Sequence, residues 1–142
     1  MRKHKFEVHD QDVPADLKFL ENKISEFNGP ELAGERRALN IICKNEDGDI
    51  IAGLGASTNW GWLYIRLLWV SEEMRGQNLG RELVLAAENA AVKRDCHGVW
   101  VDTFSVRARG FYEKLDYSVF GVLDQFPKDN QRFFLSKPLG LK

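Results

Sequence analysis

The stretch of sequence that decides the fold of this chain is LLWVSEEMRGQNLGREL, residues 67–83. It opens with an apolar run typical of a strand, passes through a polar loop, and continues as a helical pattern that begins at or just after Gly76. Gly76 and Gly80 have no Cβ, so we expect positive φ at the turn and room for a ligand close to the main chain. The stretch therefore predicts a strand, a turn and a helix.

The start of this helix is a candidate anion site. The first backbone N–H groups of a helix have no intrahelical partner and lie at the positive end of the helix dipole. Arg75 adds a planar guanidinium suited to phosphate. Glycine before a helix is often turn chemistry alone, and an arginine there is often a solvated surface charge. On these residues alone, both a pyrophosphate site and an ordinary turn stay open.

As a whole, the stretch resembles the acetyl-CoA site of the GNAT superfamily of N-acetyltransferases. In that family the pattern Arg/Gln-x-x-Gly-x-Gly/Ala, between an apolar strand and a helix, holds the pyrophosphate. Here the pattern runs from Arg75 to Gly80, after the strand end Leu68-Trp69-Val70. Asn78 stands where the family usually has the first glycine of the motif. Because Asn tolerates left-handed backbone better than most residues, we interpret it as a tolerated variant.

A second segment, residues 105–117, resembles the other GNAT signature, in which Asn, Ala and Phe-Tyr-Glu-Lys-x-Gly-Phe/Tyr follow the fifth strand. This chain reads FYEKLDY at residues 111–117. Ser105 takes the place of the Asn and offers fewer hydrogen bonds than an amide. Asp116 takes the place of the Gly, and we expect positive φ there, which Asp tolerates at some cost.

The resemblance implies an acetyl-CoA-dependent N-acetyltransferase, in which a neutral primary amine of a small molecule or peptide attacks the thioester directly. Tyr112 is the implied catalytic residue. Its phenol, with an ordinary pKa near ~10, is protonated at neutral pH and can donate to the departing thiolate. Without the motif, Tyr112 and Phe111 would be read as aromatic core, and in some members of the superfamily the tyrosine mainly positions the sulfur.

The implied acetyl-CoA contacts come from both segments. They are Leu68, Trp69, Val70, Arg75, Gly76, Gln77, Asn78, Leu79, Gly80, Arg81, Ser105, Ala108, Phe111 and Tyr112.

The oxyanion of the reaction needs preorganised donors, and backbone N–H groups at the end of the strand 68–70 are the family's usual source. Glu72, Glu73 and Asp102 are the carboxylates available as a base, but the first two also fit a solvated loop. We assign no base.

Composition and charge narrow the range of partners. With 142 residues, of which 44% are hydrophobic, the chain fits one domain, residues 1–142. A net charge of −1 offers no general attraction for nucleic acid or an anionic membrane. Cys43 and Cys96 are far apart and outside any CxxC pair, so we expect reduced thiols in the cytoplasm. His4 and His9 lack metal-ligand companions, so we expect no metal.

Alternation, helical periodicity and turn residues predict the remaining elements. We expect strands at Phe6–Val8, 38–43, 50–57, 63–70, 98–104, 117–123 and 132–137. We expect helices at about 14–27, with Asp12 as its cap, and at about 76–95 and 108–115. In the second helix, Leu79, Leu83, Ala86 and Ala90, flanked by Val84, Ala87 and Ala91, form the apolar stripe. The predicted fold is a single mixed α/β domain: a central, mostly antiparallel sheet of six or seven strands with one parallel pair, flanked by helices.

Three tryptophans lie near the 63–70 strand. Alternation places Trp60 and Trp62 on one face and Trp69 on the other, where they can serve core packing, a homodimer face or the acceptor pocket. Gly53 and Gly55 mark places where a side chain does not fit or a bulge is needed.

Two other functions remain open. Asn78, Ser105 and Asp116 depart from the family pattern, which would also fit a regulator that binds CoA without transfer activity. A nucleotide-binding module is less favoured, because the Gly-Lys-Ser/Thr ending of a P-loop is missing.

Overall fold

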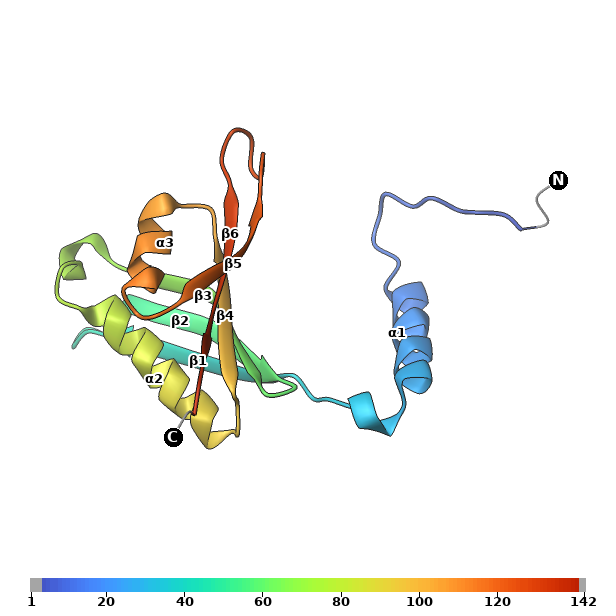
Figure 1. The fold of residues 1–142 in the computed structure, drawn as a ribbon, viewed down its shortest axis with the longest axis horizontal. Helices are drawn as coiled ribbons and strands as arrows, with labels where there is room; N and C mark the ends of the chain where they lie inside the picture. Colours follow the sequence, from blue (N-terminus) through green and yellow to red (C-terminus); the bar gives the residue numbers. More distant parts are fainter. Residues whose placement is uncertain (1–3, 141–142) are drawn as a thin grey trace. The chain divides into compact units, whose positions relative to one another are not determined.

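The computed structural model describes residues 4–140, and the chain divides into two compact units, Met1–Gly34 and Glu35–Lys142. The first unit holds helix α1 (Pro14–Asn28) and the 3-10 turn η1 (Pro30–Leu32), and the second holds the sheet with its helices (Figure 1).

Helix α1 begins and ends close to its predicted limits. Pro14 occupies the first helical position, where its missing N–H costs nothing. The N-cap is Val13, with no side-chain cap hydrogen bond, so the predicted cap by Asp12 is wrong. The predicted strand at Phe6–Val8 is also wrong, since these residues join no ladder. An alternation of three residues is too short a signal to establish a strand.

The second unit is built on one six-stranded sheet in the order β1-β2-β3-β4-β6-β5. Its strands are β1 (Arg37–Lys44), β2 (Ile50–Asn59), β3 (Trp62–Val70), β4 (Gly98–Thr103), β5 (Ser118–Leu123) and β6 (Arg132–Pro138). All neighbours are antiparallel except β3 and β4, which confirms the predicted mixed sheet with one parallel pair. Between these two strands the chain forms η2 (Glu72–Met74) and α2 (Leu79–Lys93), and α3 (Val106–Glu113) follows β4.

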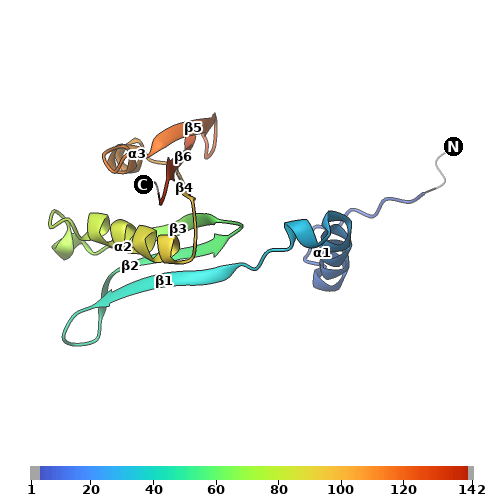
Figure 2. The ribbon, with the colours of Figure 1, turned by 60° about the horizontal axis from the view of Figure 1, so that its bottom comes forward.

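Helix α2 lies along one face of β1, β2 and β3 (Figure 2) and buries the core between helix and sheet. Ala87 and Ala91 are fully buried, and small side chains let a helix approach a sheet closely. Within the predicted stripe, Ala86 is wrong because it is exposed, and Glu88, which was not predicted, is buried. The buried face therefore contains a carboxylate.

A β-bulge interrupts the pairing of β2 with β3. Gly55 pairs with Leu67 and the next residue, Ala56, pairs with Ile65, so Arg66 is the extra residue on β3. The glycine signal for a bulge is thereby confirmed at Gly55. Because side chains alternate with a period of two, the extra residue reverses the alternation along the rest of β3.

The bulge corrects the predicted placement of the tryptophans. Trp62 pairs with Asn59 and Trp69 pairs with Gly53, two residues of β2 that share a face. Trp62 and Trp69 therefore lie on the same face of the sheet, opposite to the prediction. Trp60 lies in the turn before β3, with φ 50.

The sheet opens between its two parallel strands. Their pairing runs from Trp62 with Gly98 to Ile65 with Val101, and beyond it β3 continues to Val70 without a partner on β4. In Figure 2, α3 with β4, β5 and β6 lies on one side of this opening, and α2 with β1, β2 and β3 lies on the other. No helix within residues 4–140 has the length and apolar character to span a membrane.

Candidate active site

The turn between β3 and α2 has the backbone geometry that the glycine pattern requires. Gly76 has φ +79, as expected. Asn78 is the N-cap of α2 with φ 65 and ψ 15, so it adopts the left-handed conformation that we expected it to tolerate. Gly80 is already inside the helix and has no positive φ, so that expectation is wrong there. The helix itself begins at Leu79, slightly later than predicted.

Two adjoining cavities lie at this turn and at the opening of the sheet. The larger, here called the central cavity, has a volume of about 580 Å³. The smaller, here called the turn cavity, has a volume of about 290 Å³. They share Val70, Arg75, Gly80, Arg107 and Phe111.

The predicted acetyl-CoA residues gather around these two cavities. The central cavity is lined by Leu68, Trp69, Val70, Arg75, Gly80, Ser105, Ala108, Phe111 and Tyr112, and the turn cavity adds Gly76, Asn78, Leu79 and Arg81. Gln77 lines neither.

Arg75 connects the turn to the end of β3. Its Nε donates a hydrogen bond of 3.1 Å to the carbonyl oxygen of Val70. This fixes the guanidinium at the junction of the two cavities.

Ser105 has a structural task besides lining the central cavity. Its Oγ accepts a hydrogen bond of 3.2 Å from the backbone N–H of Ala108 and caps α3. Its backbone N–H donates to Thr103 Oγ1 at 3.3 Å. At the other end of α3, Asp116 has φ 74, as predicted.

Tyr112 belongs both to the core and to the central cavity. It is 6% exposed. The centre of its ring lies 5.0 Å from the ring centre of Phe111 and 5.3 Å from that of Tyr117. Burial, followed by the negative charge of Asp102, raises the pKa of Tyr112 from 10.0 to about 12. The phenol is therefore protonated at neutral pH and keeps its donor for a group in the cavity.

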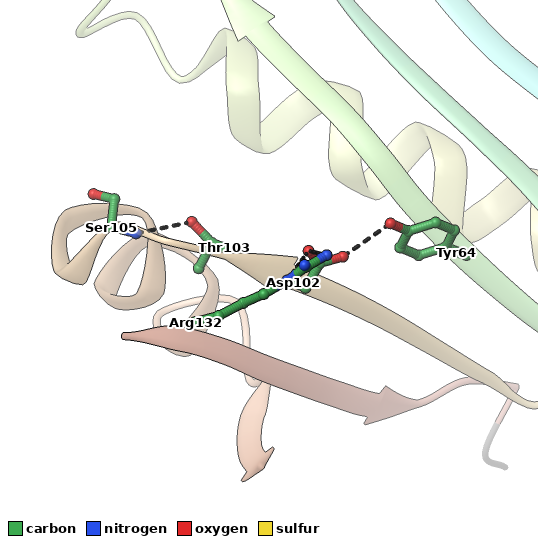
Figure 3. A network of polar contacts seen from close by, with 5 residues as sticks. All are labelled: Tyr64, Asp102, Thr103, Ser105 and Arg132. Carbon is green, nitrogen blue, oxygen red and sulfur yellow. Dashed lines mark hydrogen bonds and ion pairs between the residues drawn. The ribbon is translucent and has the colours of Figure 1, made fainter. Parts of the chain in front are cut away.

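Asp102 is held by two side chains from neighbouring strands (Figure 3). Tyr64 Oη donates to its Oδ1 at 2.9 Å, and Arg132 donates to its Oδ2 through both Nε and Nη2. The Asp102 side chain is 8% exposed and lines the central cavity. Burial and the hydrogen bond to Asp102 raise the pKa of Tyr64.

Comparison with known proteins identifies the family of the chain. Residues 6–117 match the model of the Acetyltransferase (GNAT) family. The chain belongs to the GNAT acetyltransferase family. It is therefore an acyltransferase, and its reaction is acetyl transfer from acetyl-CoA.

Individual relatives are similar over most of their lengths. Acetyltransferase Atu2258 of Agrobacterium fabrum is 37% identical over 103 residues, which cover 72% of this chain and 75% of that protein. Blasticidin-S acetyltransferase of Streptomyces morookaense is 34% identical over 109 residues, 74% of this chain and 80% of that one. The crystal structure of an acetyltransferase from Bacillus cereus ATCC 14579 superposes with a TM-score of 0.82 at 27% identity, over 94% of this chain and 98% of that one.

The three carboxylates considered as a base of this acetyltransferase differ in position. Glu72 and Glu73 are exposed in η2 and line neither cavity, which favours the solvated loop. Of these three carboxylates, Asp102 is the one that lines the central cavity.

Sequence reasoning assigned no role to Arg107, which lines both cavities of the acetyltransferase. It lies in the first turn of α3, inside the quoted second signature. With Arg75 and Arg81 it places three guanidinium groups around the turn cavity. An arginine at the start of the helix after the second parallel strand was the available signal.

Proposed function

We propose that this protein transfers the acetyl group of acetyl-CoA directly to a primary amine of a small molecule or peptide. One observation carries this proposal: the opening between β3 and β4 forms a single cavity that has Arg75 and Arg107 where it adjoins the turn cavity, and both Tyr112 and Asp102 in its wall. A cationic end suits a pyrophosphate, and a buried phenol suits a leaving thiolate.

The cationic end provides the binding of the donor. Arg75, Arg81 and Arg107 surround the turn cavity at the start of α2, where backbone N–H groups also favour an anion. The free edge of β3, residues 68–70, extends from there toward Tyr112 along the central cavity, and we assign the pantetheine arm to it.

At the reacting end, a C–N bond forms between the neutral amine and the acetyl carbon while the C–S bond breaks, and the nitrogen releases one proton to solvent water. Tyr112 stabilises the departing thiolate. Because its pKa of about 12 lies above that of an ordinary thiol, near ~8.5, a hydrogen bond to the sulfur is favoured over complete proton transfer. This supports positioning and charge stabilisation as the role of Tyr112, over proton donation as a general acid.

The departures from the family pattern no longer favour the inactive regulator. Asn78 and Asp116 adopt the left-handed backbone that a glycine would supply, and Ser105 caps α3. We therefore rank the CoA-binding regulator second.

We further propose a cytoplasmic location, since Cys43 and Cys96 are both free thiols. A homodimer stays a prediction, to be checked by analytical ultracentrifugation.

The test has two steps. Thermal unfolding is followed with acetyl-CoA, with CoA, and with ATP and NAD as controls. A ligand at a hundredfold its Kd adds about 2.7 kcal/mol of stability, and we expect this only for the two CoA species. Release of free thiol is then measured with a panel of primary amines. Binding without thiol release would favour the regulator, and stabilisation by none of the four ligands would refute the donor site.

A further inference from the structure

Asp102 lines the central cavity at a position that bears on the kind of amine this cavity accepts. Asp102 lies on β4 immediately after the last residue that pairs with β3, so it stands where the sheet opens. Its carboxylate is almost fully buried, yet it lines the cavity beside Tyr112. Among the described residues, it is the one carboxylate in the lining of that cavity.

The hydrogen bonds of Asp102 leave room for one more donor. A carboxylate offers about four lone-pair positions. Arg132 takes two on Oδ2 and Tyr64 takes one on Oδ1 (Figure 3). One position on Oδ1 is therefore open to a ligand. The three hydrogen bonds from Arg132 and Tyr64 fix the orientation of the Asp102 carboxylate.

The guanidinium of Arg132 also lies over three aromatic rings. Its guanidinium carbon lies 4.9 Å from the ring centre of Phe104, 4.8 Å from that of Phe126 and 5.3 Å from that of Phe134. Aromatic faces attract a cation. Arg132 is thus held on the Oδ2 side, away from the open position on Oδ1.

Apolar side chains form part of the walls around Asp102, and Arg66 lines the same cavity. Leu67, Trp69 and Phe104 line the same cavity, and Tyr64 stacks on Trp100 with ring centres 4.0 Å apart. The arginines of the cavity that we assign to the donor lie at its other end, where the turn cavity adjoins. A single oriented carboxylate beside the apolar side chains of Leu67, Trp69 and Phe104 fits a cation carried on an apolar body.

We propose that Asp102, oriented by Tyr64 and Arg132, binds the ammonium form of the acceptor and thereby selects primary amines that are cationic at neutral pH and carried on an apolar or aromatic body. This inference rests on the proposed acetyl transfer and specifies its substrate class. Asp102 acts in binding, before the ammonium loses a proton to solvent water and attacks as the neutral amine.

The test compares benzylamine, which is cationic at pH 7, with aniline, which is neutral there and has a similar ring. Each is titrated by calorimetry into the enzyme saturated with CoA, a complex in which no transfer can occur. The proteins are the wild type, Asp102→Asn, and the matched control Glu88→Gln, which alters a buried carboxylate outside the cavities. CoA affinity is measured separately for each protein.

We expect benzylamine to bind the wild type and Glu88→Gln equally, and Asp102→Asn about 10- to 100-fold more weakly, the usual effect of losing a charge-assisted hydrogen bond. The affinity for aniline should differ by less than about threefold between the wild type and Asp102→Asn. Tyr64→Phe keeps the charge of Asp102 but loses one hydrogen bond that orients it. This variant should weaken the binding of benzylamine by about 3- to 10-fold.

Turnover adds a second readout. With benzylamine as acceptor, Asp102→Asn should raise KM while kcat stays within about threefold, because a binding interaction is lost. A loss of kcat for benzylamine and aniline alike would assign Asp102 to proton removal and overturn the binding role.

Two other outcomes would also overturn it: equal benzylamine affinity in the wild type and Asp102→Asn, or no benzylamine binding to the wild-type CoA complex. If CoA itself fails to bind, the donor site is refuted first, and this inference falls with it.

Discussion

Two buried carboxylates in this protein have nearly the same partners and different surroundings. Asp102 accepts hydrogen bonds from Tyr64 and Arg132. Glu88, on α2, accepts one from Tyr117 Oη at 2.7 Å and one from Lys137 Nζ at 2.8 Å. Their side chains are 8% and 7% exposed.

The difference between the two networks is the space beside them. Asp102 lines the central cavity, whereas Glu88 lines neither that cavity nor the turn cavity and ties α2 to β6 and to the segment after α3. Burial and pairing are therefore insufficient signs of function, because structural networks show them as well. A functional site also needs access for a ligand.

The largest expected effect is on folding. Glu88→Ala leaves Tyr117 and Lys137 without their acceptor in a largely buried place, so we expect a loss of about 3 to 5 kcal/mol in the free energy of unfolding. Urea denaturation measures this loss. The affinity for CoA should not change in the fraction that stays folded.

A loss below about 1 kcal/mol would show that the Glu88 network is solvated and would end the comparison with Asp102.

Two neighbouring tyrosines, Tyr112 and Tyr117, test the same difference between a residue that lines a cavity and one that belongs to a structural network. Tyr112→Phe should lower kcat by about 10- to 100-fold, the effect of one hydrogen bond to a developing charge, with acetyl-CoA affinity and stability nearly unchanged. Tyr117→Phe is the matched control: it loses its bond to Glu88, so stability falls by about 1.5 to 3 kcal/mol while kcat is kept. Full activity of Tyr112→Phe would exclude its role at the thiolate.

A pair of arginines on α3 tests whether cavity lining marks function. Arg107 lines both cavities, whereas Arg109 forms an ion pair with Glu113 at 3.4 Å and lies over the Phe133 ring. We expect Arg107→Ala to weaken CoA binding about tenfold, as for one charged contact to phosphate, and Arg109→Ala to leave it unchanged. Isothermal titration with CoA measures both variants. Equal effects would remove Arg107 from the donor site.

The local parts of the site could be predicted from the sequence. The turn between β3 and α2, the left-handed backbone at Asn78 and Asp116, and the single parallel pair all follow from short motifs and from the order of elements. Backbone requirements of a turn are encoded within a few residues, so a single sequence contains them.

The networks depend on pairing between distant strands, which no local pattern encodes. Tyr64 and Asp102 are 38 positions apart and Asp102 and Arg132 are 30 apart, and they meet only because β3, β4 and β6 are neighbours. The bulge at Arg66 likewise depends on the register of β2 and reversed the predicted faces of the tryptophans. Glu88 could have been suspected, since it follows Val84 by four positions on the buried face of α2.

The smallest expected effect concerns alkaline pH. Because the pKa of Tyr112 is raised from 10.0 to about 12 in the folded state, the native protein holds this proton more tightly than the unfolded chain. The stabilisation is complete below pH 10 and is lost as pH rises from 10 through 12. At pH 11 the loss from Tyr112 should be about 1 kcal/mol. Tyr117, whose pKa is raised by burial and by Glu88, contributes in the same direction, so Tyr112 must be isolated by difference.

Unfolding of the wild type and of Tyr112→Phe at pH 9 and pH 11 gives that difference. Between pH 9 and pH 11, the free energy of unfolding of the wild type should fall by about 1 kcal/mol more than that of Tyr112→Phe. In Asp102→Asn this excess should shrink, because the charge of Asp102 is the second cause of the raised pKa, whereas Glu88→Gln should leave it unchanged. An excess that is the same in Asp102→Asn as in the wild type would mean that burial alone sets the Tyr112 proton. The two carboxylates would then differ only in ligand access.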